Sequence, residues 1–265
     1  MNRINGKQFA MLLVFFLVFV APFLLLLIKS ISFGWAWPQW KPDKIDFRAW
    51  HIIFTDPDIV DSIKTTIIIG TAVVVLNFLL AIPAAGALSR YNFKGKTFIE
   101  SVLLMPILIP VLAIAMGMHL TMIRLGLADR MAGVILIHLL PTLPYAIRML
   151  KAGFDRLSIE WNEQAATLGA QKGAAFWTVT FPLLLPSIRS TALLVFVISL
   201  SQYVLTAIIG GGQVTTLPMI YYPYFNSADE AVIAGFSAVF ALLPILFLTI
   251  FEGAIQVYLQ LVKRP

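Results

Sequence analysis

Side chains able to bind a metal or to carry out acid–base chemistry are few in this sequence and lie far apart. The three histidines, His51, His119 and His138, fall in different segments, with no second histidine four residues away and no carboxylate at a metal-ligand spacing. Cysteine is absent, which excludes disulfides, thiol chemistry and cysteine-bound metals. We therefore predict no catalytic residue, no metal site and no cofactor, and a protein that is not an enzyme.

The tripeptide Gly95-Lys96-Thr97 matches the end of a phosphate-binding loop, but the rest of that motif is missing. The loop needs a second glycine at position 90, where this chain has arginine, and it follows a strand rather than an apolar span. We interpret this tripeptide as a basic turn. Any ATP hydrolysis linked to this protein is then expected in a separate subunit.

The composition is that of a membrane protein. Hydrophobic residues make up 60% of the chain and charged residues 12%, which would leave a soluble domain almost no polar surface. A helix needs about 20 apolar residues to cross roughly 30 Å of hydrocarbon. We predict an all-α polytopic membrane protein, one transmembrane domain over residues 1–265 with six spans. These are placed at about 9–28, 62–88, 98–121, 129–150, 182–208 and 230–258.

The basic residues indicate the partner surface and the orientation of the spans. The formal net charge is +6, but lysine and arginine are scattered along the junctions between spans, which suits the headgroups of a lipid bilayer and not nucleic acid. With the N-terminus inside, the inner segments hold 11 of them and the outer segments 7, leaving out Arg189 within the fifth span. Both termini and segment 155–176 are therefore expected in the cytoplasm, and segments 29–61 and 207–228 outside.

Two segments outside the spans are long enough to bind a partner. The outer one, 29–61, carries Trp35, Trp37, Trp40 and Trp50, which fits either an aromatic belt at the headgroups or a docking surface for an external protein. The inner one contains the alanine-rich stretch 163–182. Helical phasing places Glu163, Ala166 and Ala170 on one face, and Ala165 and Gly169 on a neighbouring face. We predict a cytoplasmic amphipathic helix whose small side chains allow another protein to approach closely.

This stretch resembles the cytoplasmic signature of the permease subunits of binding-protein-dependent ATP-binding-cassette (ABC) importers. The signature reads E-A-A, three residues, G, nine residues, I-x-L-P. Glu163, Ala165, Gly169 and Pro182 fit it, while glutamine, valine and phenylalanine replace its first alanine, its isoleucine and its leucine. Further likeness lies in 61–66, in Pro106 to Pro110, in Ser199 to Tyr203, and in the glycines at 210–212 with Thr216-Leu217-Pro218. The likeness to the branch for polyamines, aminoethylphosphonate, thiamine or ferric iron is strongest near 199–218.

The resemblance implies a function and a set of partners. It implies a multi-pass permease of a prokaryotic cytoplasmic (inner) membrane that moves a small polar solute inward, with an organic amine of the polyamine type favoured. ABC ATPase subunits, a second permease copy or a homologous permease, and an extracytoplasmic solute-binding protein would be its partners. The glutamate and glycine would dock in a cleft of the ATPase, with Pro182 ending the helix at a sharp turn into the fifth span. The residues expected to couple to the ATPase are Glu163, Ala165, Ala166, Gly169, Ala170 and Pro182.

The solute path is expected where polar side chains gather within a span. The fifth span carries such a group, which either lines the path or makes hydrogen bonds between helices: Ser199, Ser201, Gln202, Tyr203 and Thr206. His119 and His138 present the same two alternatives. A secondary transporter without an ATPase partner is the alternative function, but it calls for inverted repeats and intramembrane carboxylates, and neither is visible.

Overall fold

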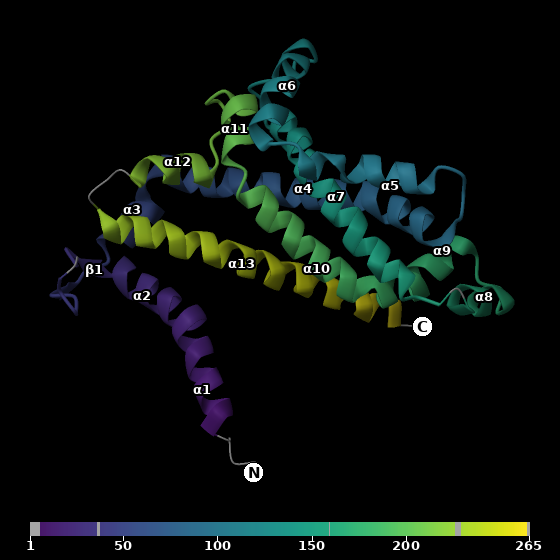
Figure 1. The fold of residues 1–265 in the computed structure, drawn as a ribbon, viewed down its shortest axis with the longest axis horizontal. Helices are drawn as coiled ribbons and strands as arrows, with labels where there is room; N and C mark the ends of the chain where they lie inside the picture. The colour runs from purple at the N-terminus through teal and green to yellow at the C-terminus, as the bar shows by residue number, and fades with distance from the viewer. Residues whose placement is uncertain (1–5, 36–37, 159, 226–228, 264–265) are drawn as a thin grey trace. The chain divides into compact units, whose positions relative to one another are not determined.

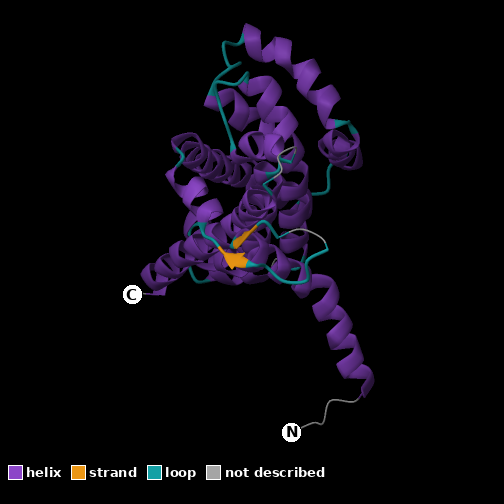
Figure 2. Cartoon of the chain, turned by 90° about the vertical axis from the view of Figure 1, so that its left-hand side faces the viewer, coloured by secondary structure: helices purple, strands orange, loops and turns teal. Residues whose placement is uncertain are grey.

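The computed structural model describes residues 6–35, 38–158, 160–225 and 229–263, and helices dominate its regular structure (Figure 1). Within these ranges the exception is one antiparallel pair of two-residue strands, β1 (Ser32–Phe33) and β2 (Lys44–Ile45), with Ser32 opposite Ile45 (Figure 2). The predicted all-α class is confirmed. Trp37 lies outside the described residues.

The chain divides into two compact units. Residues up to Ser62 together with Ile220–Leu243 form the first unit, and Ile63–Met219 with the residues from Pro244 onward form the second. The helices, in chain order, are α1 (Gly6–Phe15), the π-helix η1 (Phe16–Val20), α2 (Ala21–Ser30), α3 (Arg48–Thr55), α4 (Pro57–Arg90), α5 (Lys96–Leu104), the 3₁₀ helix η2 (Met105–Leu108), α6 (Val111–Arg124), α7 (Met131–Asp155), α8 (Glu160–Thr167), α9 (Lys172–Ala175), the π-helix η3 (Phe176–Thr180), α10 (Phe181–Leu200), α11 (Tyr203–Gly210), α12 (Leu217–Tyr224) and α13 (Glu230–Lys263).

Five helical stretches among the described residues are long and apolar enough to cross a membrane, or up to six if one bent pair counts as a span. The five are Met11–Ser30, Pro57–Arg90, Met131–Asp155, Lys172–Leu200 and Glu230–Val262. The bent pair, Lys96–Leu108 with Val111–Arg124, turns by 101°. The third predicted span, 98–121, is therefore not one straight helix. Pro110 lacks an N–H and holds Ile109 in an extended conformation, so helical bonding stops there.

The fifth predicted span, 182–208, also differs at both ends. It stops at Leu200, and α11 follows after the break at Ser201 and Gln202. Toward the N-terminus the helical stretch continues back to Lys172, so Pro182 does not end a helix, contrary to prediction. The missing N–H of Pro182 falls next to the π-helical turn η3, a departure from regular helical bonding of the kind that tolerates proline inside a helix.

Close helix packing marks the second unit. A Cβ added to Gly153 of α7 would lie 2.4 Å from the Ser187 Oγ of α10, so these two helices meet at the glycine. The Phe196 ring of α10 stacks on the Phe247 ring of α13, with centroids 4.1 Å apart. Glycine and flat rings thus bring membrane helices together where no hydrophobic effect can drive them.

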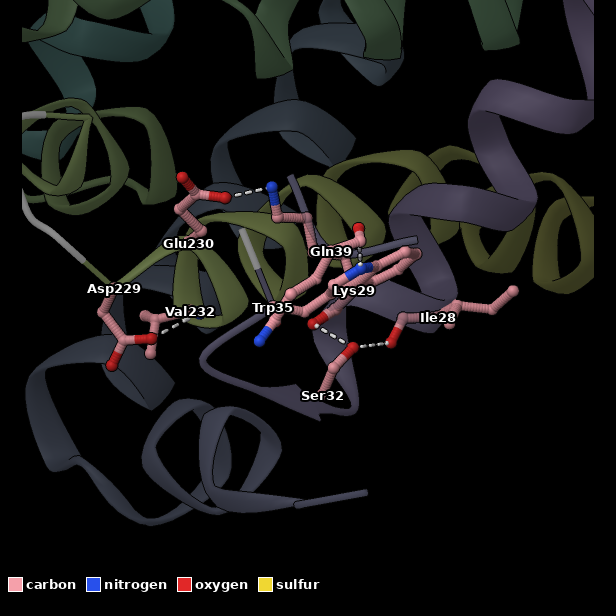
Figure 3. Close-up of polar contacts among 8 residues, drawn as sticks. All are labelled: Ile28, Lys29, Ser32, Trp35, Gln39, Asp229, Glu230 and Val232. Carbon is pink, nitrogen blue, oxygen red and sulfur yellow. Dashed lines mark hydrogen bonds and ion pairs between the residues drawn. The ribbon is translucent and has the colours of Figure 1, made fainter. Parts of the chain in front are cut away.

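Charged pairs hold the first unit together near the start of α13. Lys29, at the end of α2, pairs with Glu230, and the Arg48 guanidinium of α3 lies 2.5 Å from the Asp229 carboxylate. Figure 3 shows the first of these pairs beside the loop after α2, where the Trp35 indole donates to the Gln39 carbonyl. The end of α2 and the start of α3 are thereby tied to the start of α13. The two alternatives for segment 29–61, an aromatic belt at the headgroups and a docking surface for an external protein, both stay predictions.

Candidate coupling segment and polar regions of the membrane helices

The predicted coupling segment contains a short, largely exposed helix, α8. Glu160 and Glu163 stand in its first turn, where carboxylates complement the partial positive charge of a helix N-terminus. Glu163 and Ala166 are exposed, whereas Ala165 is buried on the side where α8 packs on α9 and η3. The expected small side chains are therefore divided between an inner face and an outer face.

Gly169 ends this helix, whereas the sequence predicted that it lies within one. Its φ is +84°, in the left-handed region, and its N–H donates to the Ala166 carbonyl while that of Ala170 donates to the Ala165 carbonyl. These two bonds form a Schellman motif with Gly169 as the left-handed residue. The predicted common face of Glu163, Ala166 and Ala170 is wrong beyond Thr167, because the chain reverses direction at the glycine.

Two large apolar side chains stand at the ends of α8, and the sequence reasoning missed both. Leu168 is 88% exposed and Trp161 is 51% exposed. The available signal was a tryptophan and a leucine flanking an otherwise polar helix. Tryptophan is among the residues enriched at the centre of protein–protein contacts.

Two of the predicted path residues, Ser199 and Thr206, lie in a buried hydrogen-bond network around His138. The His138 side chain of α7 is 1% exposed, with Nδ1 3.0 Å from the Ser199 Oγ and Nε2 3.0 Å from the Thr206 Oγ1. Thr206 donates its own proton to the Gln202 carbonyl at 2.6 Å, so it accepts from a protonated Nε2. Nδ1 then accepts from Ser199. His138 thus links α10 to α11 across their break.

The other predicted path residues lie at that break. The Ser201 hydroxyl and the Gln202 amide both donate to the Ile198 carbonyl, at 2.9 and 3.1 Å, which occupies an oxygen at the open end of α10. Ser201 is exposed, and Gln202 and Tyr203 are half-buried. Of the two alternatives for this group, hydrogen bonding between or within helices accounts for Ser199, Ser201, Gln202 and Thr206.

A second buried contact joins α4 to α7. The Asn77 Nδ2 donates to the Thr142 Oγ1 at 2.9 Å and to the Val73 carbonyl at 2.8 Å, and Thr142 donates to the His138 carbonyl at 2.7 Å. Both side chains are fully buried. Together with the His138 contacts, this makes one continuous polar network through the four helices α4, α7, α10 and α11, named here the His138 network: Asn77, His138, Thr142, Ser199 and Thr206.

A different polar surface lies on α10 and the C-terminal half of α13, which run side by side (Figure 1). Arg189 forms an ion pair with Glu252, in which Nη2 donates to Oε1 at 2.8 Å and Nε lies 2.7 Å from Oε2. The pair borders an open groove of about 590 Å³. Its polar and small lining residues, named here the Arg189 face, are Arg189, Ser190, Thr249, Glu252, Gly253 and Gln256.

The sequence contained a signal for the Arg189 face that was not used. Its four residues on α13 follow the spacing i, i+3, i+4, i+7, from 249 to 256, within an apolar helix. Sequence reasoning placed Arg189 inside a span and Glu252 near a cytoplasmic helix end, but could not pair them. Their separation of 63 residues explains why only the packing of α10 on α13 reveals the pair.

Comparison with known proteins supports one family. The sequence pattern of the family described as "Binding-protein-dependent transport system inner membrane component" matches residues 77–262. A molybdate/tungstate transport system permease protein of Pyrococcus abyssi is 27% identical over 183 residues, 69% of this chain and 73% of its own length. A sulfate transport system permease protein of Escherichia coli is 24% identical over 243 residues, 83% of this chain and 85% of its own length.

Solved structures give the same fold. A bacterial ABC transporter that imports the acidic polysaccharide alginate has a chain that matches with a TM-score of 0.74 and 21% identity, covering 94% of this chain and 95% of that one. A second structure, of an alginate ABC transporter in complex with a periplasmic protein bound to an alginate pentasaccharide, matches with a TM-score of 0.65 and 16% identity. These similarities show the fold.

Proposed function

Because this chain belongs to the family of binding-protein-dependent transport system inner membrane components, we propose a specific working arrangement for it. It is a permease subunit of an ABC importer. It pairs with a second copy or a homologous permease, receives a small solute from an extracytoplasmic binding protein, and is driven by a separate ATPase subunit. ATP binding changes the relative stability of two conformations of the membrane helices, and hydrolysis resets them.

The observation that carries this proposal is the exposed helix α8 with its glycine stop. Trp161 and Leu168 are anchors of a size that fills a cleft in a partner, and the exposed Ala166 between them leaves room for its backbone. Gly169 fixes where the helix ends, so the direction of Leu168 depends on it. We assign the ATPase contact to α8 and its stop, with Glu163 supporting the helix N-terminus and Ala165 holding α8 to the rest of the chain.

The test compares two glycines in the same segment. Gly169→Trp adds bulk at the stop and strains a left-handed residue, whereas Gly173 has no positive φ, and an added Cβ there meets no atom of the described chain within 4 Å. We expect Gly169→Trp to abolish uptake and co-purification of the ATPase while membrane insertion persists, and Gly173→Ala to change neither. If Gly169→Trp retains both uptake and ATPase association, α8 is not the docking helix.

Orientation is part of the proposal. The charge bias supports cytoplasmic termini and a cytoplasmic α8. Since the sequence contains no cysteine, single cysteines can be introduced at Ser158 and Gln39. The Gln39 cysteine should react with an impermeant maleimide in intact cells, and the Ser158 cysteine should react only after permeabilisation. Reaction at Ser158 alone would reverse the orientation.

For the solute we propose a small tetrahedral oxyanion of the molybdate or sulfate type. The relatives named for molybdate, tungstate and sulfate support this class more than the organic amine expected from the sequence. Uptake of labelled molybdate, sulfate and spermidine by proteoliposomes holding the complete transporter distinguishes the two. Uptake of spermidine alone would restore the amine, and uptake that needs an ion gradient but not ATP would favour a secondary transporter.

A further inference from the structure

The Arg189 face lies at a depth where lipid is a poor neighbour for it. An aromatic cluster lies near one end of this pair of helices, α10 and α13. The ring centroid of Phe181 is 5.1 Å from that of Trp177 and 5.2 Å from that of Tyr258. Tryptophan and tyrosine gather at the headgroup boundary of a membrane. At 1.5 Å per helical residue, Glu252 lies about 9 Å beyond Tyr258 and Arg189 about 12 Å beyond Phe181. Half of a hydrocarbon core is about 15 Å. The pair therefore sits within the core.

The pair is also not sealed inside the chain. The Arg189 and Glu252 side chains are 36% and 32% exposed, and Thr249, Gly253 and Gln256 beside them are exposed. Arg189 does not extend toward the headgroups, because its guanidinium pairs with Glu252. Charged side chains at such depth face either a partner helix or water. The described part of the chain leaves the Arg189 and Glu252 side chains partly uncovered. Water or another protein chain, and not lipid, must therefore cover this face.

The chemistry of the face favours a hydrated anion. Arg189 supplies a planar cation with donors suited to a tetrahedral oxyanion, and the Gln256 amide adds neutral donors. The Ser190 and Thr249 hydroxyls donate to their own helices, so they present acceptor lone pairs to water. Glu252 neutralises Arg189 when no solute is present. An anion approaching the groove competes with Glu252 for the same guanidinium, which allows binding that is specific yet weak enough for release.

We propose that the Arg189 face lines the water-filled path of the transporter and that Arg189 contacts the oxyanion during passage. This rests on the proposed function for the class of solute, but not for the presence of water. In this proposal the Arg189 face takes the role predicted for Ser199 and Thr206, because the hydroxyls of those two residues are hydrogen-bonded to His138. The other possible cover, the same face of a second copy, is decided by the experiment below.

The first experiment measures water access. In the otherwise cysteine-free chain, cysteines replace Thr249 or Gln256 on the face, and Ile250 or Val257 one residue further along as exposed apolar controls. In proteoliposomes of the complete transporter, with a hydrophilic maleimide on both sides, we expect the face cysteines to react at least tenfold faster than the controls. Disulfide cross-links between copies without labelling would assign the face to a second copy, and equal slow labelling at all four positions would place it in lipid. Either result overturns the proposal.

The second experiment tests the role of the cation. Arg189→Gln combined with Glu252→Gln removes both charges and leaves no lone charge to impair folding. We expect molybdate or sulfate uptake to fall at least tenfold while the ATPase still co-purifies, and Arg189→Lys to retain part of the uptake. Uptake equal to that of the unaltered protein would overturn the contact. If the unaltered transporter takes up no oxyanion, the proposed solute fails, while the labelling rates still decide whether the face is wet.

Discussion

The His138 network and the Arg189 face are both polar regions of membrane-spanning helices, yet they differ in what surrounds them. In the network, the side chains come from four helices and are all buried, and each hydroxyl has a defined partner. On the Arg189 face, two charges satisfy each other and leave a groove beside them. Polar residues within a span therefore join helices in one place and, as we propose, line a water-filled path in the other. Burial distinguishes the two.

The largest effect on stability is expected at the centre of the network. His138→Ala leaves a cavity and removes a hydrogen-bond partner from both Ser199 and Thr206, which should cost about 2–4 kcal/mol. His119→Ala, at a half-buried position of α6, should cost less than about 1 kcal/mol. Unfolding in detergent, followed by circular dichroism, measures both. Equal costs for the two histidines would remove the distinction between the network and the rest of the bundle.

Two glycine-to-alanine substitutions, one where α7 packs on α10 and one on the Arg189 face, compare a packed region with an open one. Gly153→Ala places a methyl group 2.4 Å from the Ser187 Oγ, and overpacking of this kind costs about 1–3 kcal/mol. At Gly253, on the Arg189 face, an added Cβ meets no described atom within 4 Å, so Gly253→Ala should stabilise the helix by about 0.5–1 kcal/mol. The same unfolding measurement applies. A destabilising Gly253→Ala would indicate that another molecule packs on this face.

Threonines sharpen the comparison at a smaller scale. Thr142→Val removes the acceptor of the Asn77 amide between α4 and α7, and contacts of this type in membranes contribute about 0.6 kcal/mol on average and about 1.7 at most. Thr249→Val removes only a bond to the Ile245 carbonyl of its own helix, so its stability should hardly change. A double-mutant cycle of Asn77→Ala with Thr142→Val isolates the contribution of the Asn77–Thr142 hydrogen bond to the free energy of unfolding. A coupling near zero would show that the network is not held by this bond.

A small stability change is expected for Arg189→Gln, despite the role in transport that we propose for this residue. If water hydrates the face, the remaining Glu252 is solvated and the loss is that of an exposed pair, below about 1 kcal/mol. If lipid covers the face, a lone charge in hydrocarbon costs about 2.5–3.5 kcal/mol. The free energy of unfolding in detergent and the yield of insertion into membranes, each compared with the unaltered protein, distinguish the two expected losses. A loss in the higher range would make the two polar regions alike and contradict the proposed path.

The predicted coupling segment, 155–176, shows that sequence reasoning identified the family but not the local structure. The spacing of Glu163, Ala165 and Gly169 identified the segment and its family, because the pattern is local. The role of Gly169 as a helix stop was missed, since glycine is compatible with either a helix interior or a left-handed cap. Likewise, Pro182 predicted a helix end, but the adjacent π-helical turn lets the helix continue.

The sequence by itself determined the all-α membrane class and the permease family, because each depends on composition or on residues close together in the chain. Only the tertiary structure decided which polar residues are buried and which are open. Ser199 and Thr206 became partners of His138, and Arg189 met Glu252 across 63 residues. The physical reason is that a polar group in a bilayer must find a partner, and the choice between a neighbouring helix and water depends on which helices lie side by side.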